Sequence, residues 1–195
     1  MNKSLPADYQ PYSKDISEVM FTHEELQACV KRLGDAISAD YAGQELVMIG
    51  VLKGVLFFMA DLMRAVRIPV VYDFLAVSNY TPDTRNQGLV RLVKDLDISI
   101  TDRPVIFVED VIDTGLTLNY LLRNLNGRKP ASLEVCSLFN KPAHRLIDID
   151  VKYKGFDIPD KFIVGYGLDY GEQYRNFPFV GVLSSNAYKR MMFGS

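Results

Sequence analysis

The sequence predicts an α/β fold in which a central, mostly parallel sheet is flanked by helices. Short apolar runs typical of fully buried strands occur at residues 46–52, 70–77 and 105–108. Other segments repeat apolar residues at helical spacing, as the four leucines between 118 and 125 do. Strands that alternate with helices favour a parallel sheet. The length of 195 residues suits a single domain, 1–195, with a sizeable core.

Composition narrows the class of protein. Hydrophobic residues at 48% and charged residues at 24% are ordinary for a soluble globular protein. The formal net charge of −2 provides no broad basic field for nucleic acid, and no apolar run approaches membrane-spanning length. The polar N-terminus lacks a signal-peptide pattern. Cys29 and Cys136 lie in apolar patterns, which favours buried free thiols. We therefore expect a cytoplasmic protein that binds neither nucleic acid nor membrane.

The first helix and strand are expected between residues 22 and 52. Thr22 and Glu25 match a capping box, and apolar residues follow at helical spacing through Ile37. This helix is expected to lie on the sheet. The strand at 46–52 ends at Lys53-Gly54, which opens a second helix that extends to Arg64.

The second half of the predicted sheet is interrupted by a polar stretch. The strand at 70–77 leads into residues 78–88, which show no periodicity. A long loop inside a compact domain is often a lid, although a mobile surface hairpin explains this stretch equally well. Further strands are expected at 89–93, 133–139, 151–156 and 161–167.

Residues 105–117 carry the clearest chemistry. An apolar strand ends in Glu109 and Asp110, and Asp113 and Gly115 then open a helix whose first amides have no partner inside it. Such amides bind phosphate, and glycine lets the backbone approach closely. Carboxylates accept hydrogen bonds from sugar hydroxyls and hold Mg²⁺ directly or through water. The stretch therefore predicts a sugar-phosphate site with Mg²⁺. The alternative is an ordinary strand with Asp113 as a helix N-cap.

This stretch resembles the diphosphate-ribose signature of type I phosphoribosyltransferases, most closely the hypoxanthine-guanine branch. The signature consists of apolar residues, two acids, two apolar residues, then Asp, Ser or Thr, Gly, any residue and Thr, as at 105–117. The resemblance implies the fold of that family, in which a small hood built from the chain ends covers the base. It also implies a homodimer or homotetramer.

The resemblance further implies which residues bind phosphoribosyl diphosphate. Leu52-Lys53-Gly54 matches the family's pyrophosphate loop, which often has a non-proline cis bond before the lysine. Taken alone, Lys53 is better explained as a surface lysine at a strand-to-helix turn. The full set expected to bind the donor is Leu52, Lys53, Gly54, Glu109, Asp110, Asp113, Thr114, Gly115, Leu116, Thr117 and Arg175.

The purine site is expected from Lys141 and the segment 162–175. The resemblance implies that Lys141 contacts the oxygen at position six of the purine and that Phe162 stacks on the base. The carbonyl group of Ile163 would read the edge of the base, and Asp169 would approach the base and a metal. Taken alone, this segment is better explained by core packing for Phe162 and a surface ion pair of Asp169 with Arg175.

The metal and lid residues also follow from the resemblance. Mg²⁺ is expected at the carboxylates of Glu109, Asp110 and Asp169. The start of the family's flexible loop is matched by Ser78, Asn79 and Tyr80. The family usually has Ser-Ser-Tyr-Gly or Ser-Tyr here, so this chain keeps the tyrosine but changes both of its neighbours, which bears on loop closure. The two histidines, His23 and His144, are interpreted as solvated side chains without a role.

The implied reaction is Mg²⁺-dependent transfer of the 5-phosphoribosyl group from phosphoribosyl diphosphate to a 6-oxopurine. Hypoxanthine or guanine would yield IMP or GMP and pyrophosphate, and Asp113 would act as the catalytic acid–base group. One alternative is a regulator that senses nucleotides, or binds RNA, without efficient catalysis. Another is an enzyme for xanthine or adenine. The presence of both Asp113 and Arg175 favours an enzyme.

Overall fold

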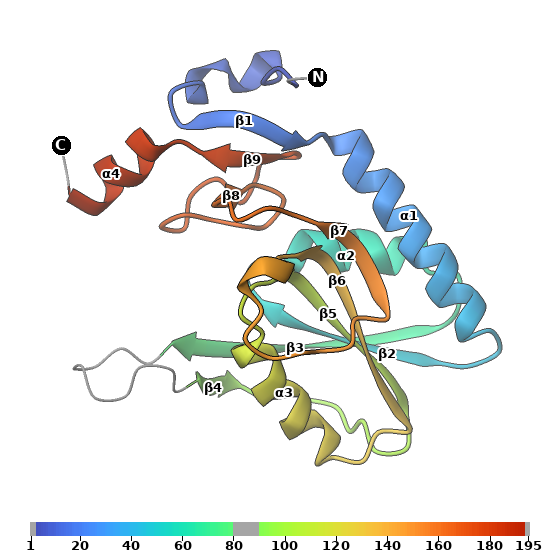
Figure 1. Cartoon of the computed structure of the whole chain (residues 1–195). Helices are drawn as coiled ribbons and strands as arrows, with labels where there is room; N and C mark the ends of the chain where they lie inside the picture. The colour runs from blue at the N-terminus through green and yellow to red at the C-terminus, as the bar shows by residue number, and fades with distance from the viewer. Residues whose placement is uncertain (1–2, 80–89, 194–195) are drawn as a thin grey trace.

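The computed structural model describes residues 3–79 and 90–193. Its centre is a six-stranded sheet in the order β4-β3-β2-β5-β6-β7 (Figure 1). All neighbouring strands are parallel except β4, which pairs antiparallel with β3 at one edge. The prediction of a mostly parallel sheet is therefore confirmed. The strands are β2 (Leu46–Leu52), β3 (Val70–Asn79), β4 (Val90–Lys94), β5 (Pro104–Ile112), β6 (Ser132–Asn140) and β7 (Tyr153–Asp157).

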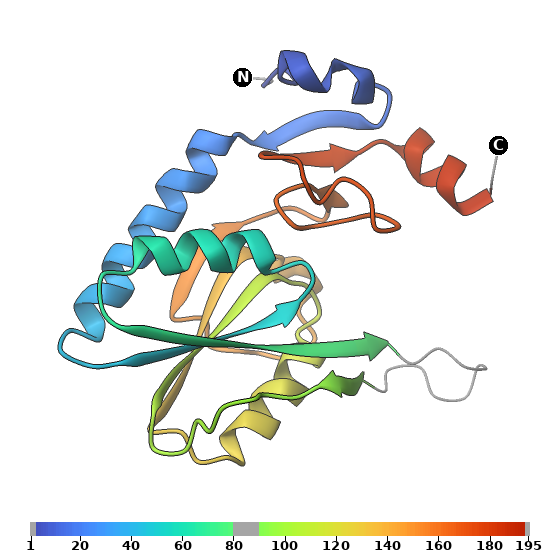
Figure 2. The same cartoon turned by 180° about the vertical axis from the view of Figure 1, so that it is seen from behind.

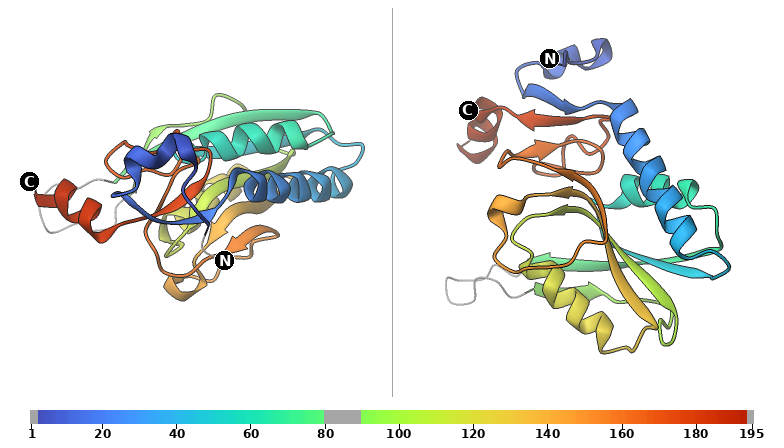
Figure 3. Two further views of the ribbon diagram at one scale, coloured as in Figure 1. Left: turned by 90° about the horizontal axis from the view of Figure 1, so that it is seen from above. Right: turned by 45° about the vertical axis from the view of Figure 1, so that its right-hand side comes forward.

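Helices cover both faces of this sheet. They are α1 (His23–Asp40), α2 (Leu56–Ala65) and α3 (Leu116–Asn126). In Figures 2 and 3, α1 and α2 lie side by side over one face, and α3 covers the other. Successive strand residues point to opposite faces. Leu46 and Met48 of β2 therefore pack with α1 and α2, whereas Val47 and Ile49 pack with α3. Burial on both faces explains why these strands are continuous apolar runs.

The start of α1 has the predicted capping box. The amide of Glu25 donates to Thr22 Oγ1 at 3.4 Å, and the amide of Thr22 donates to Glu25 Oε2 at 2.9 Å. Cys29 of this helix is a buried free thiol, as is Cys136 of β6, in agreement with the prediction. The next helix, α2, begins at Leu56 and not at Lys53, because the residues between form a turn.

A second, three-stranded sheet forms the hood, in the antiparallel order β1-β9-β8. It joins both ends of the chain, since it consists of β1 (Ile16–Phe21), β8 (Ile163–Val164) and β9 (Val180–Leu183), with α4 (Ser185–Phe193) after them. Figure 1 shows it above the main sheet. Short 3₁₀ helices lie at Ala7–Tyr12 and Pro142–His144. The strand expected at 161–167 is wrong beyond Val164, because Gly165, Tyr166 and Gly167 turn the chain with positive φ angles of 100°, 51° and 102°.

A shared apolar core holds the hood to the main sheet. Ile163, Val180 and Val182 of the hood belong to the same buried cluster as α1, α2 and the facing side of β6. This packing fixes the hood loops over the carboxyl ends of the parallel strands. No helix within 3–79 and 90–193 is long and apolar enough to cross a membrane.

Candidate active site

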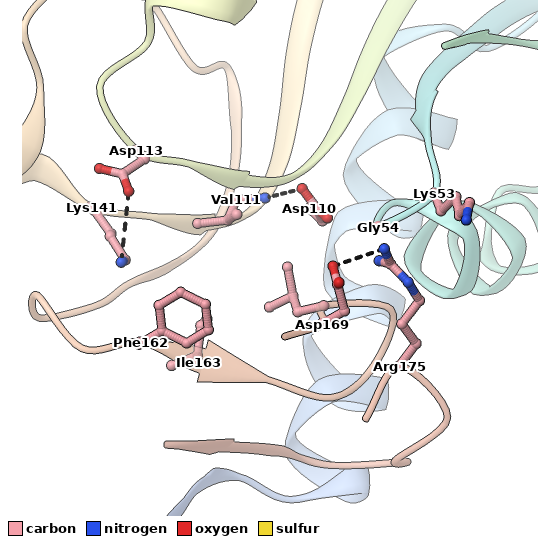
Figure 4. A pocket seen from close by; sticks show the side chains of 11 residues that line it. Lys53, Gly54, Asp110, Val111, Asp113, Lys141, Phe162, Ile163, Asp169 and Arg175 are labelled. Carbon is pink, nitrogen blue, oxygen red and sulfur yellow. Dashed lines mark hydrogen bonds and ion pairs between the residues drawn. The ribbon is translucent and has the colours of Figure 1, made fainter. Parts of the chain in front are cut away.

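A cavity of about 380 Å³ lies between the carboxyl ends of the main sheet and the hood (Figure 4). The predicted site residues that line it are Lys53, Gly54, Asp110, Asp113, Lys141, Phe162, Ile163, Asp169 and Arg175. A second cavity of about 270 Å³ continues toward the start of α3, and it is lined by Glu109, Thr114, Gly115 and Thr117. Both cavities share Asp110 and Asp113, so the predicted donor and purine residues line two adjoining cavities.

A few predicted residues do not line either cavity. Leu52 and Leu116 are absent from the lining of both cavities. Leu52 directly precedes Lys53 in the chain, and Leu116 directly follows Gly115. Ser78 and Asn79 lie inside β3, where they pair with Arg91 and Val90, so the loop starts later than expected. Tyr80 lies outside the described residues.

The turn from β5 into α3 requires its glycine. Gly115 has a φ of +83°, and a Cβ atom there would lie 3.1 Å from Ile149 Cδ1 and 3.3 Å from the Ile147 carbonyl oxygen. Helix α3 begins at the next residue, so its first amides have no partner inside the helix. The nearest one, of Leu116, reaches only Thr114 Oγ1 at 3.4 Å. Such a helix start, lined by two threonine hydroxyls, can bind a phosphate group.

Two further glycines bring distant parts of the chain together. The peptide bond between Leu52 and Lys53 is cis, and a Cβ atom on Gly54 would lie only 1.8 Å from Asp110 Oδ2. A Cβ atom on Gly167 of the hood would lie 2.0 Å from the carbonyl oxygen of Gly54. Only glycine permits this approach of the end of β2, the end of β5 and the hood.

Charged groups from the hood surround this contact. Arg175 donates to the carbonyl oxygen of Gly167 at 2.7 Å and pairs with Asp169 at 2.8 Å. Glu172 lies 2.9 Å from Lys53 Nζ and 3.3 Å from Arg175. The Nε of Arg175 is buried and has no hydrogen-bond partner within the described part of the chain. The two cations and this unused donor suit a polyanion such as pyrophosphate.

The two carboxylates at the end of β5, Glu109 and Asp110, are buried, and burial disfavours their ionised forms. Burial raises the pKa of Glu109 well above its usual range, and the neighbouring Asp110 adds to the effect. Burial also raises the pKa of Asp110 to about 6, although the Val111 amide donates to it at 2.6 Å and Arg175 attracts its charge. A bound cation would stabilise both carboxylates in the ionised form.

The three predicted metal ligands do not form a closed metal site. No three carboxylate, thiol or imidazole groups of residues 3–79 and 90–193 converge closely enough to hold a metal ion. The assignment of Glu109, Asp110 and Asp169 as metal-binding residues therefore stays a prediction. Both oxygens of Asp169 are engaged, one by Arg175 and one by the Glu172 amide at 2.8 Å. An open site still fits Mg²⁺, which keeps several waters and binds through one or two carboxylates plus substrate oxygens.

The base-binding end of the cavity combines an aromatic ring with a lysine. Phe162 is 45% exposed, and its ring is held edge-on by Tyr170 at 5.3 Å between centroids. Lys141 is buried, and its amide donates to the Ile112 carbonyl oxygen at 2.9 Å, which continues the pairing of β5 with β6. The side chain of Lys141 points toward Asp113, and its Nζ lies 3.8 Å from Asp113 Oδ2 (Figure 4).

Comparison with known proteins decides the family. A model of the phosphoribosyl transferase domain matches residues 19–171. The chain belongs to the phosphoribosyltransferase family. It is 47% identical over 185 residues to the hypoxanthine-guanine phosphoribosyltransferase of Mycobacterium avium, covering 92% of this chain and 91% of that protein. It is also 47% identical over 176 residues to the same enzyme of Streptococcus agalactiae, covering 90% and 98%.

Solved structures agree with this assignment. A hypoxanthine phosphoribosyltransferase of Staphylococcus aureus superimposes with a TM-score of 0.87 at 42% identity, covering 92% of this chain and 97% of that one. A Trypanosoma cruzi hypoxanthine phosphoribosyl transferase gives a TM-score of 0.88 at 36% identity, covering 96% and 99%. The predicted fold and the predicted class of enzyme, a phosphoribosyltransferase, are confirmed.

Sequence reasoning missed three residues at this phosphoribosyltransferase site. Gly167 and Glu172 lie in a segment that was recognised, but nothing local shows that they meet Gly54 and Lys53. His144 is partly exposed, as a surface residue should be, but its contact with Asp113 was not expected. The available signal was its position just after a strand that ends at the site.

Proposed function

We propose that this phosphoribosyltransferase salvages purines by Mg²⁺-dependent transfer of the 5-phosphoribosyl group from phosphoribosyl diphosphate to hypoxanthine or guanine. The products would be IMP or GMP and pyrophosphate. The observation that carries the proposal is the pair of adjoining cavities, which are lined by a helix start with free amides, two cations, an exposed aromatic ring and a buried lysine. The relatives with 47% identity are hypoxanthine-guanine phosphoribosyltransferases, which supports the choice of base.

The donor would bind along the ends of β2 and β5 and the start of α3. The amides from Asp113 to Thr117 would hold the 5′-phosphate, and Glu109 and Asp110 would accept hydrogen bonds from the ribose hydroxyls. Arg175 and the Lys53-Gly54 backbone would contact the pyrophosphate. Their charges and dipoles offset the negative charge that develops as pyrophosphate leaves.

The base would bind between the hood and the end of β6. Phe162 offers a ring face for stacking, and the carbonyl group of Ile163 offers an acceptor for the base edge. Lys141 donates hydrogen bonds only, so it suits the oxygen of a 6-oxopurine better than the amino group of adenine. Asp113, 3.8 Å from Lys141 Nζ, would accept the proton that the base loses as its nitrogen attacks.

Mg²⁺ would be held by Asp110, with Glu109 and Asp169 acting through water. When bound, it neutralises the leaving pyrophosphate. The raised pKa values of Glu109 and Asp110 support this assignment, because a cation relieves the cost of burying two adjacent carboxylates.

The remaining proposals concern the whole molecule. The segment that follows Ser78 and Asn79 of β3, which the resemblance matches to the family's flexible loop, would close over the donor and exclude water. The apolar core shared by hood and main sheet supports one domain over 1–195. A homodimer or homotetramer is proposed from the resemblance to the family. Two buried free cysteines accord with a reducing compartment such as the cytoplasm.

A purine panel tests the proposed function. The protein is incubated with phosphoribosyl diphosphate and Mg²⁺, and nucleotide formation is followed separately with hypoxanthine, guanine, xanthine and adenine. We expect product with hypoxanthine or guanine and none with adenine. Product with xanthine alone would show that the enzyme uses xanthine in place of hypoxanthine or guanine. Absence of product with every base, in folded protein that still binds the donor, would favour the nucleotide-sensing regulator.

A further inference from the structure

His144 bridges two carboxylates at the base-binding end of the cavity. Its Nδ1 lies 3.0 Å from Asp113 Oδ1, and its Nε2 lies 2.8 Å from Asp160 Oδ2. The 3₁₀ turn Pro142–His144 directly after β6 places the ring there. The other cation facing this group is Lys141, whose Nζ is 3.8 Å from Asp113 Oδ2 and 4.0 Å from Asp160 Oδ1.

The hydrogen-bonding pattern fixes what the ring can do. An ionised carboxylate only accepts hydrogen bonds, so each ring nitrogen that contacts one must donate. The ring is therefore placed to donate from Nδ1 to Asp113, and its Nε2 faces Asp160 on the other side. The adjacent Arg145 does not compete for Asp113, because its guanidinium donates to Asn140 and is attracted to Asp148 and Asp157.

The consequence concerns the second oxygen of Asp113. A half-exposed aspartate can rotate, and its carboxylate has two equivalent oxygens. A bond from His144 to Oδ1 removes this freedom and leaves Oδ2 on the side of Lys141, which lines the main cavity together with Asp113. Catalytic groups that are held in a productive orientation react faster than ones that must find it.

We propose that His144 is a positioning residue that orients Asp113 toward the purine, with Asp160 holding the ring from its other side. The proposal rests on the proposed function, in which Asp113 accepts the proton of the base. It predicts that loss of the His144–Asp113 hydrogen bond lowers turnover and leaves binding of phosphoribosyl diphosphate intact.

A matched pair of substitutions tests this role. The amide nitrogen of asparagine takes the place of Nδ1, so His144→Asn keeps a donor toward Asp113. The amide nitrogen of glutamine takes the place of Nε2, so His144→Gln keeps a donor toward Asp160 only. We expect kcat to fall about tenfold in His144→Gln and His144→Ala, the effect of losing a hydrogen bond to a charged group, and to stay within about threefold in His144→Asn. The KM for the donor should change less than about twofold in all three.

The outcomes separate this proposal from the proposed function. His23→Ala, which changes the only other histidine, is the control and should behave as the wild type. Equal turnover of the asparagine and glutamine variants would overturn the positioning role, even in a fully active enzyme. A wild-type protein that forms no nucleotide would instead overturn the proposed function.

Nitrogen-15 NMR of the two histidines provides a readout that does not need activity. We expect the Nδ1 resonance of His144 to shift in Asp113→Ala and its Nε2 resonance to shift in Asp160→Ala. His23→Ala assigns the signals. An Nδ1 resonance unchanged in Asp113→Ala would show that the bridge does not exist in solution, and the proposal would fall.

Discussion

Replacement of Gly167 by alanine should separate the hood from the main sheet at the active site. Gly167 has a φ of +102°, and an added Cβ atom would lie 2.0 Å from the carbonyl oxygen of Gly54. That oxygen belongs to the backbone, so it cannot move away by a side-chain rotation. The loop that carries Asp169 and Arg175 must therefore shift away from Lys53 and Gly54.

The loss of stability expected for Gly167→Ala has two parts, a backbone part and a packing part. A positive φ costs an L-residue about 1–2 kcal/mol, and overpacking adds about 1–3 kcal/mol. We therefore expect Gly167→Ala to lower the free energy of unfolding by about 2–5 kcal/mol. Gly43→Ala is the matched control, because Gly43 has a φ of +78° but nothing lies within 4 Å of an added Cβ atom. It should lose only the backbone part, about 1–2 kcal/mol.

Urea denaturation with linear extrapolation measures both losses. Pyrophosphate binding, measured by calorimetry at fixed Mg²⁺, follows the site itself. Arg175 donates to the Gly167 carbonyl oxygen at 2.7 Å, so a shifted loop misplaces its guanidinium. We expect at least about tenfold weaker pyrophosphate binding in Gly167→Ala, since hydrogen bonds to charged groups contribute about 1.5–3 kcal/mol. Equal losses of stability in the two variants, with unchanged pyrophosphate binding, would refute this reasoning.

Three further predictions concern the carboxylates and the lysine. Asp113→Asn should lower kcat about 10²–10⁴-fold with donor binding retained, because it removes the proton acceptor; near-normal turnover would contradict that role. Lys141→Ala should reduce the kcat/KM for 6-oxopurines more than for adenine, and an equal loss for every base would exclude a reading role. Burial raises the pKa of Asp110 from 3.8 to about 6, so the metal-free folded state binds more protons than the unfolded chain between these values. The contribution of Asp110 to stability in EDTA, measured as the wild-type free energy of unfolding minus that of Asp110→Asn, should therefore fall as the pH rises from about 4 to about 6; a difference that stays constant or rises over this range would exclude a raised pKa.

Local patterns were sufficient for much of the fold. The capping box at Thr22, the buried strands and the leucines of α3 each consist of residues that are close together in the sequence. Their spacing along the chain is therefore enough to predict a helix or a strand. The strand, turn and helix at 105–117 form a contiguous unit. Its helix start after a glycine turn was therefore predictable, and the resemblance to phosphoribosyltransferases added the order of the remaining predicted site residues. The hood strands β1 and β9 were not expected, because short strands at the chain ends carry little periodic signal.

The sequence by itself thus determined the order of the main-sheet strands and helices, the donor signature and the family. The tertiary structure alone decided which distant groups touch. Lys53 meets Glu172 across 119 positions of the chain, and His144 meets Asp113 across 31. Gly167 packs against the backbone of Gly54. Apart from the two glycines themselves, nothing in the sequence around either position predicts this contact. Such contacts depend on how the packed hood and sheet are placed relative to each other. No local spacing encodes that placement, because it results from burial of the whole core.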